Sequence, residues 1–116
     1  MSEAASNKAL LLALGLASRA RKLICGTDII CTQLRAKASE VKLVIEASDT
    51  SDNTHKKIND KCAYYGIRCV RVSVDALDLG HAVGKGRQVA SLAITDEALA
   101  TLVLSKLEDA TWTTNI

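Results

Sequence analysis

Apolar side chains recur along this chain at two spacings, one typical of helices and one typical of buried strands. Between residues 6 and 20 they fall three and four positions apart, which gathers them on one helical face. Residues 41–47, Val-Lys-Leu-Val-Ile-Glu-Ala, form a mostly apolar run rich in β-branched residues, as in a strand buried on both faces. Together the two patterns predict strands at 23–25, 41–47, 67–73 and 88–94, and helices at 6–20, 27–36, 53–65, 75–83 and 96–107.

Small polar residues and glycines predict where these elements begin and end. Ser6 and Thr95 are the expected caps of the first and last helices, and Thr27 or Asp28 is the expected cap of the second. Gly66 fits the C-terminal cap of the third helix. The connections between elements are therefore only a few residues long.

The regular alternation of helix and strand predicts an α/β fold, a three-layer α-β-α sandwich with a four-stranded mixed sheet. At 116 residues the chain makes a single domain, with a core at about 5–107 and a loose tail at 109–116. Phe and Pro are absent and aromatic residues make up only 3%, so Ala, Leu, Ile and Val must build the core. That composition suits helices packed on a sheet better than an all-β sandwich.

Composition also narrows the cellular setting. No apolar run approaches the roughly 20 residues of a membrane-spanning helix, and the first residues lack the basic start and apolar block of a secretory signal. We therefore expect a cytoplasmic protein that does not insert into a membrane. The cysteines lie within apolar segments without a Cys-x-x-Cys pair, which favours buried reduced thiols over disulfides or a zinc site; they are Cys25, Cys31, Cys62 and Cys69.

Residues suited to catalysis are scattered. His55 and His81 lie in unrelated segments without a nearby cysteine or carboxylate pair, so we expect surface or interface histidines. Asp49 and Asp52 flank a turn, where capping is the usual role of aspartate. The Gly-Lys-Gly-Arg run at 84–87 lacks the Ser or Thr and the helix that follow Gly-Lys in a nucleotide-binding loop. A small enzyme is thus the least supported class, and we expect no cofactor or metal.

Positive charge is concentrated in two segments. The formal net charge is only +2, but residues 1–37 carry six basic and two acidic side chains, and residues 61–90 carry five and two. These segments also hold the glycine-marked turns at Gly26 and at 84–87. Such a distribution is typical of a localised anion site on a nearly neutral protein, although an uneven solvated surface would look the same.

The strand at 23–25 passes directly into a helix through Gly26. A corner of this kind leaves the first backbone N–H groups of the helix unpaired, with the positive end of the helix dipole behind them, and therefore suits an anion. In a sandwich of this order we expect the corner and the basic loop at 84–87 to lie at one end of the molecule. The alternative is a plain helix cap.

Four segments resemble the kink-turn RNA-binding ribosomal proteins, the family of archaeal L-seven-Ae and eukaryotic L-thirty-e. They are Gly26-Thr-Asp-Ile-Ile, the strand at 41–47, Leu79-Gly-His-Ala-Val-Gly-Lys85 and the strand ending Ala-Ile-Thr-Asp96. The similarity spans about residues 5–107, and the Leu-Gly-x-Ala-x-Gly-Lys block is its most specific part. Small bacterial members outside the standard ribosomal set look most similar, through the Leu-Ala-Ser-Arg-Ala-Arg-Lys start and the Cys-Ala-Tyr-Tyr segment.

The resemblance implies the same sandwich and RNA contacts at the corner and the loop. In the family the glycine-marked turn is followed by Asn or Lys, then Glu or Gln, and one helical turn later by Lys; these residues read the sheared G·A pairs of a kink-turn. The matching positions here are Asp28, Ile29 and Thr32, and all three depart from that pattern.

We therefore predict a non-enzymatic, ribosome- or translation-associated protein that binds kink-turn or internally looped RNA, ribosomal RNA among the candidates, as a monomer rather than an oligomer. The alternative is a protein–protein interaction module that keeps the fold and has lost strong kink-turn binding. The expected RNA-binding residues are Lys22, Gly26, Thr27, Asp28, Ile29, Thr32, Arg35, Gly84, Lys85, Gly86 and Arg87.

Overall fold

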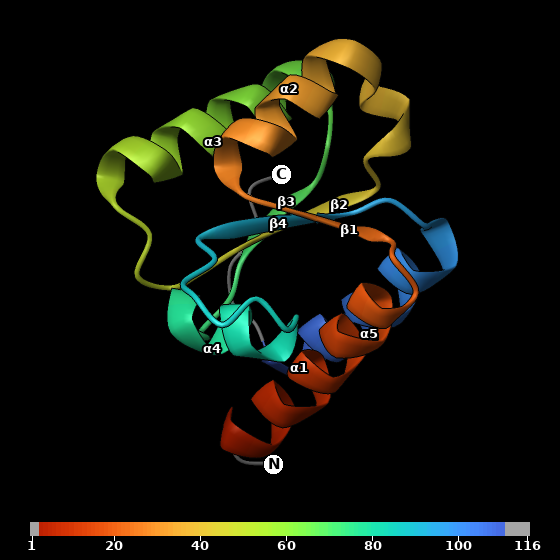
Figure 1. Ribbon diagram of the computed structural model, residues 1–116, viewed down its shortest axis with the longest axis vertical. Coiled ribbons are helices and arrows are strands. Elements are labelled where there is room, and N and C mark those ends of the chain that lie inside the picture. The colour runs from red at the N-terminus through yellow and green to blue at the C-terminus, as the bar shows by residue number, and fades with distance from the viewer. Residues whose placement is uncertain (1–2, 111–116) are drawn as a thin grey trace.

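A four-stranded mixed sheet divides the protein into three layers (Figure 1). The computed structural model describes the backbone of residues 3–110 and the side chains of residues 7–107. The strand order is β1-β4-β2-β3; β2 is parallel to β3, and β4 is antiparallel to both β2 and β1. The strands are β1 Leu23–Cys25, β2 Leu43–Glu46, β3 Cys69–Arg71 and β4 Ser91–Ile94. The predicted α-β-α sandwich with a mixed sheet is confirmed.

Helices cover both faces of the sheet. Figure 1 shows α2 and α3 on one face and α1, α4 and α5 on the other. Their bounds are α1 Glu3–Arg19, α2 Thr27–Lys37, α3 Asp52–Tyr65, α4 Ala76–Ala82 and α5 Glu97–Ala110, and a short 3-10 turn, η1 Ala38–Glu40, follows α2. None of these described helices combines the length and the apolar character needed to cross a membrane. Of the loose tail expected at 109–116, the first two residues belong to α5 and the rest lie outside the described residues.

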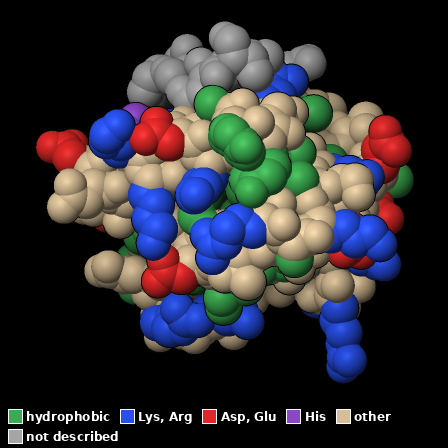
Figure 2. Space-filling view, turned by 90° about the horizontal axis from the view of Figure 1, so that it is seen from above, with side chains coloured by type: hydrophobic (Ala, Val, Ile, Leu, Met, Phe, Trp, Pro, Cys, Tyr) green, Lys and Arg blue, Asp and Glu red, His purple; other side chains and the backbone are tan. Residues whose placement is uncertain are grey.

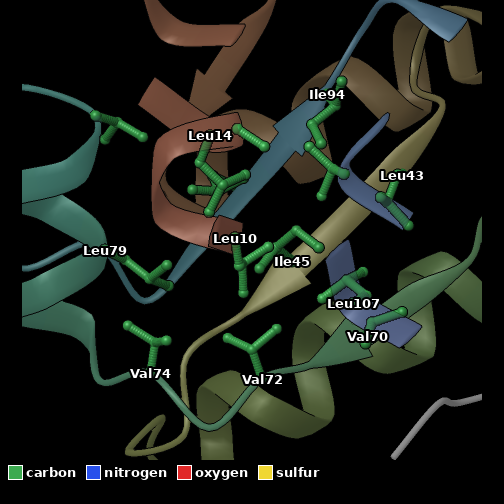
Figure 3. Close-up of a cluster of buried hydrophobic side chains, with 14 of the residues drawn as sticks. Leu10, Leu14, Leu43, Ile45, Val70, Val72, Val74, Leu79, Ile94 and Leu107 are labelled. Carbon is green, nitrogen blue, oxygen red and sulfur yellow. The ribbon is translucent and has the colours of Figure 1, made fainter. Parts of the chain in front are cut away.

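The sheet separates two hydrophobic cores because alternate residues of each strand point to opposite faces. Leu43 and Ile45 of β2 enter the larger core under α1, α4 and α5, which Figure 3 shows in close-up. Val44, between them, enters the smaller core under α2 and α3. All four residues of β2 are buried, which confirms the prediction of a strand enclosed on both faces.

The cysteines are free thiols in the structure. Cys31, Cys62 and Cys69 are buried as predicted, and all three belong to the smaller core. Cys25 differs, because it ends the edge strand β1 and is only half-buried.

Two helix starts differ from the predicted ones. Helix α1 begins at Glu3 rather than at Ser6, since the residues before Ser6 are good helix formers and an acidic residue suits a helix N-terminus. Helix α5 is capped by Asp96, whose Oδ2 accepts from the Leu99 amide at 2.9 Å. Thr95 cannot cap this helix, because its own amide donates to the Lys22 carbonyl and keeps it in the extended chain.

Strands β2, β3 and β4 are shorter than predicted, because neighbouring helical segments take up their first residues. The Val41 amide donates to the Ala38 carbonyl and completes η1, so β2 begins at Leu43. The Ile67 amide donates to the Cys62 carbonyl, so this residue still completes the end of α3 after Gly66, which caps the helix as expected with a φ of 71°. The Val89 amide donates to the Ala76 carbonyl at the start of α4. Strand pairing therefore begins only at Cys69 and Ser91.

The loop at 84–87 folds back onto α4 at Gly80. A Cβ on Gly80 would lie 1.6 Å from the Arg87 carbonyl oxygen, so only glycine allows this approach. The Lys85 amide donates to the Gly80 carbonyl at 2.9 Å. Gly84 and Gly86 have φ values of 74° and 65°, a conformation that favours glycine. Helix α4 thereby determines the course of the basic loop.

We expect Gly80→Ala to lower the free energy of unfolding by about 1–3 kcal/mol, because the added methyl group must displace backbone rather than a flexible side chain. Urea unfolding followed by circular dichroism measures the effect. The control is His81→Ala on the exposed side of the same helix, which should change stability by less than about 0.5 kcal/mol. Equal stability of the two variants would contradict the packing of the loop on α4.

Candidate functional site

The corner between β1 and α2 is formed by Gly26. Its φ of 112° turns the chain, while its amide extends the β1–β4 pairing by donating to the Ser91 carbonyl at 3.0 Å. Gly26 is itself the N-cap, so no side chain caps α2 and the predicted cap at Thr27 or Asp28 is wrong. Because glycine turns the chain one residue earlier than a side-chain cap would, Thr27 and Asp28 already lie in the helix.

The residues after Gly26 point in different directions. Thr27 Oγ1 and the Oγ of the buried Ser91 share a hydrogen bond of 2.9 Å, which ties the first turn of α2 to β4. Asp28 and Ile29 point outward, and 59% of Ile29 is exposed. The corner thus has one anchoring side chain and two that are accessible to a ligand.

Helix α3 brings a cation to this corner. Lys57 Nζ donates a hydrogen bond to Asp28 Oδ1, across 29 residues of sequence. This hydrogen bond and the positive charge of Lys57 lower the pKa of Asp28, and the same contact raises the pKa of Lys57. The carboxylate at the corner is therefore balanced by a neighbouring ammonium group.

The basic loop reaches the same place. Arg87 lines an open hollow of about 550 Å³ together with Cys25, Gly26, Thr27, Asp28, Ile29, Thr54 and Lys57. Burial raises the pKa of the Cys25 thiol, and the positive charges of Lys85 and Arg87 partly oppose that effect, which places both cations near the end of β1. The structure thus brings the corner and the 84–87 loop together at one end of the molecule.

Three further predicted site residues, Lys22, Thr32 and Arg35, do not line this hollow. Thr32 is one helical turn beyond Asp28 and donates to its carbonyl oxygen at 3.0 Å. Arg35 follows one turn later, exposed, with Nη2 at 3.5 Å from Thr32 Oγ1. Lys22 precedes β1 at its other end and lines a separate hollow with Lys42. Thr32 and Arg35 therefore continue the corner along α2, whereas Lys22 does not join it.

A buried carboxylate holds α3 in position. Glu46 of β2 is fully buried; its Oε2 lies 2.6 Å from His55 Nδ1, and its Oε1 accepts from Asn59 Nδ2 at 3.1 Å. Because both partners come from α3, these contacts place Thr54 and Lys57 beside the corner. His55, expected to be a plain surface or interface histidine, keeps 37% of its side chain exposed and belongs to this network.

The sequence did not identify Lys57 as a site residue, because it is one of several lysines within the predicted helix at 53–65. A signal for the network beneath it was present, because a Glu inside a strand predicted to be buried on both faces needs partners. Figure 2 shows the surface over α2 and α3, where Lys and Arg side chains gather around a hydrophobic patch. The candidate site thus comprises the Gly26 corner together with Lys57 and Arg87, which line one hollow.

Among the described residues, no group of three or more His, Cys, Asp and Glu side chains could hold a metal ion. Asp49 Oδ1 accepts from the amide of Ala76, the first residue of α4, at 2.8 Å, whereas the N-cap of that helix is Asp75. Asp52 lies in the first turn of α3, whose cap is Ser51.

The fold and the corner define a class of small α-β-α proteins in which a glycine joins an edge strand to a helix. The chain belongs to the ribosomal protein L7Ae/L30e/S12e/Gadd45 family, whose model matches residues 8–103. It is 40% identical over 95 residues to the RNA-binding protein YlxQ of Bacillus subtilis (strain 168), covering 82% of this chain and 91% of that protein. It is 38% identical over 89 residues to RNA-binding protein YlxQ of Enterococcus faecium, covering 77% and 82%.

Solved structures show the same fold. A protein of unknown function from Bacillus halodurans C superimposes with a TM-score of 0.76 at 31% identity, covering 85% of this chain and 96% of that one. The Giardia lamblia 15.5kD RNA binding protein gives a TM-score of 0.70 at 18% identity, covering 90% and 87%. At that low identity the second likeness is one of fold alone.

The ion pair at the corner predicts a pH effect. In an NMR titration the Asp28 carboxyl group should titrate below the usual range for Asp, and Lys57→Met should raise its pKa toward that range. Folding lowers the pKa of Asp28, so the ion pair stabilises the folded protein at pH values above the ordinary Asp pKa. This stabilisation is lost as the pH falls through the lowered pKa. The effect is small because the site is exposed.

The matched control for this titration is Lys56→Met, which removes the exposed Lys56–Asp60 pair and leaves Asp28 unchanged. Equal shifts of the Asp28 pKa in both variants would show that general surface charge, rather than the Lys57 contact, determines it.

Proposed function

We propose that this protein binds structured RNA, a kink-turn or an internal loop, through the Gly26 corner and the 84–87 loop. The observation that carries the proposal is the single hollow that the N-terminus of α2, Lys57 and Arg87 line together. We further propose that it acts as a non-enzymatic, cytoplasmic, ribosome- or translation-associated protein and binds as a monomer.

The chemistry of the hollow suits a sharply bent RNA strand. Backbone N–H groups at a helix N-terminus and cationic side chains bind phosphate oxygens, which position an RNA without reading its sequence. Lys85 and Arg87 supply such cations on one side of the corner and Lys57 on the other. A strand that changes direction at this point can contact both sides at once.

Asp28 and Ile29 are suited to contact bases. A carboxylate accepts hydrogen bonds from the N1 and N2 groups of guanine, and the ion pair with Lys57 offsets its repulsion of phosphate. The exposed side chain of Ile29 offers an apolar surface to an unstacked base. Base-edge contacts contribute roughly 1–3 kcal/mol each, so few are needed for selectivity.

The relatives support the same proposal. Two proteins with 40% and 38% identity bear the name RNA-binding protein, and the matched family includes ribosomal proteins. Both alignments cover most of this chain.

A second candidate function is protein–protein interaction through the corner. Ile29 favours it, because a large apolar side chain that is 59% exposed beside an ion pair also suits a protein partner. RNA binding takes precedence because of the cations on both sides of the corner.

Replacing Lys85 and Arg87 together by Ala should weaken binding to every RNA and lower the salt dependence of log Kd by about two units, since two phosphate contacts are lost. Titrations of labelled kink-turn RNA and of a matched straight duplex at several salt concentrations measure both effects. Lys106→Ala on α5 is the control and should bind as the unmodified protein does. An unchanged salt slope in the double variant would exclude the loop from the interface.

Replacing Ile29 by Glu and Thr32 by Lys should strengthen kink-turn binding about tenfold while leaving duplex binding unchanged, because the change adds one base-edge and one phosphate contact at the corner. Both side chains are exposed, so the fold should tolerate the change. The same paired titrations provide the measurement. No gain in kink-turn affinity would mean that RNA does not occupy the corner, and would favour the protein-interaction function.

A further inference from the structure

A second hollow lies next to the corner, along the exposed side of α3. It has a volume of about 570 Å³ and is lined by Lys57, Asp60, Lys61, Tyr64 and Tyr65. Lys57, Lys61 and Tyr64 follow one another at spacings of four and three, and Asp60 lies four before Tyr64, so these residues share one side of the helix. Lys57 lines this hollow and the corner hollow, so the two surfaces are continuous.

An aromatic ring is presented at the far end of this side of α3. Tyr64 is 81% exposed, an unusual state for an aromatic residue in a chain that has so few. Its ring meets that of Tyr65 edge to face, with the centroids 4.8 Å apart and the planes at 83°. Tyr65 packs against the core under α2 and α3, so the exposed ring rests on a fixed support.

Two cations lie beside this ring. Lys61 makes no ion pair with any of the residues that the structure describes. Lys57 donates to Asp28, and the other two N–H donors of its ammonium group can bind a phosphate. The one acidic residue of the hollow, Asp60, is already bound by Lys56, whose Nζ lies 3.0 Å from Asp60 Oδ2. An aromatic face with ammonium groups beside it fits a single-stranded nucleic acid, whose bases stack while its phosphates bind the cations.

We propose that α3 binds an unpaired RNA segment that continues from the corner, with a base stacked on Tyr64 and phosphates at Lys57 and Lys61. Lys57 and Tyr64 lie about 10 Å apart along the helix axis, a distance that a short run of nucleotides spans. The inference rests on the proposed RNA-binding function, and it adds a second type of recognition, of a single strand that flanks the folded RNA.

Three RNAs test this proposal with the full chain. One is a kink-turn with two blunt helical ends, and the other two carry an unpaired uridine tail of about eight nucleotides on one end or the other. One of the tailed RNAs should bind the unmodified protein at least about fivefold more tightly than the blunt RNA. Tyr64→Ala should abolish this gain without changing the affinity for blunt RNA, and Tyr64→Phe, which keeps the ring, should retain it.

Lys61→Ala gives a second readout. It should lower the salt dependence of log Kd by about one unit on the favoured tailed RNA and leave that on the blunt RNA unchanged. Lys106→Ala on α5 is the control, because this lysine does not line the hollow and does not pair with Asp60.

The outcomes separate the inference from the function on which it rests. One outcome is that the protein prefers the kink-turn over a duplex and yet gains no affinity from either tail. In that case the α3 surface is not an RNA site, whereas the corner function stands. If the gain persists in Tyr64→Ala, or is lost equally in Tyr64→Phe, stacking on this ring is wrong. If no folded RNA binds better than a duplex, the proposed function itself fails. If the α3 surface binds a protein partner and the RNA tails add no affinity, the proposal is likewise wrong.

Discussion

The antiparallel pairing of β1 with β4 is the constraint on which the rest of the site depends. β1 has three residues and lies at the edge of the sheet, so β4 alone determines its register, with Cys25 opposite Leu92. That register aligns the Gly26 amide with the Ser91 carbonyl and places Thr27 within reach of the Ser91 hydroxyl. Because a shift of one residue in the pairing would reverse every side chain of β1, the corner has one geometry.

A second constraint acts from beneath the surface. Glu46 is a fully buried acidic residue at the end of β2, a position that is unfavourable unless its oxygens are paired. Its partners on α3, His55 and Asn59, both depend on one placement of that helix. Lys57 on the same helix thus owes its position beside the corner to a polar contact made beneath the surface.

Local patterns were sufficient to predict the architecture, but not the contacts that complete the site. The apolar run at 41–47 and the glycine at 66 identify a buried strand and a helix end because both signals lie within a few residues. The Asp28–Lys57 pair joins residues 29 positions apart, and the cap of α5 moves to Asp96 because Thr95 pairs with Lys22 across the sheet. Such contacts follow from the packed fold, so spacing along the chain does not reveal them.

The close approach of Gly80 to the Arg87 carbonyl has a consequence for the energetics of recognition. A basic loop in free solution would lose conformational entropy on meeting its ligand, and that loss would reduce the affinity. Here the helix and two left-handed glycines already hold the loop in one course in the unliganded protein. The conformational entropy of the loop was therefore lost during folding. Binding should change the conformation of the ligand more than that of the loop.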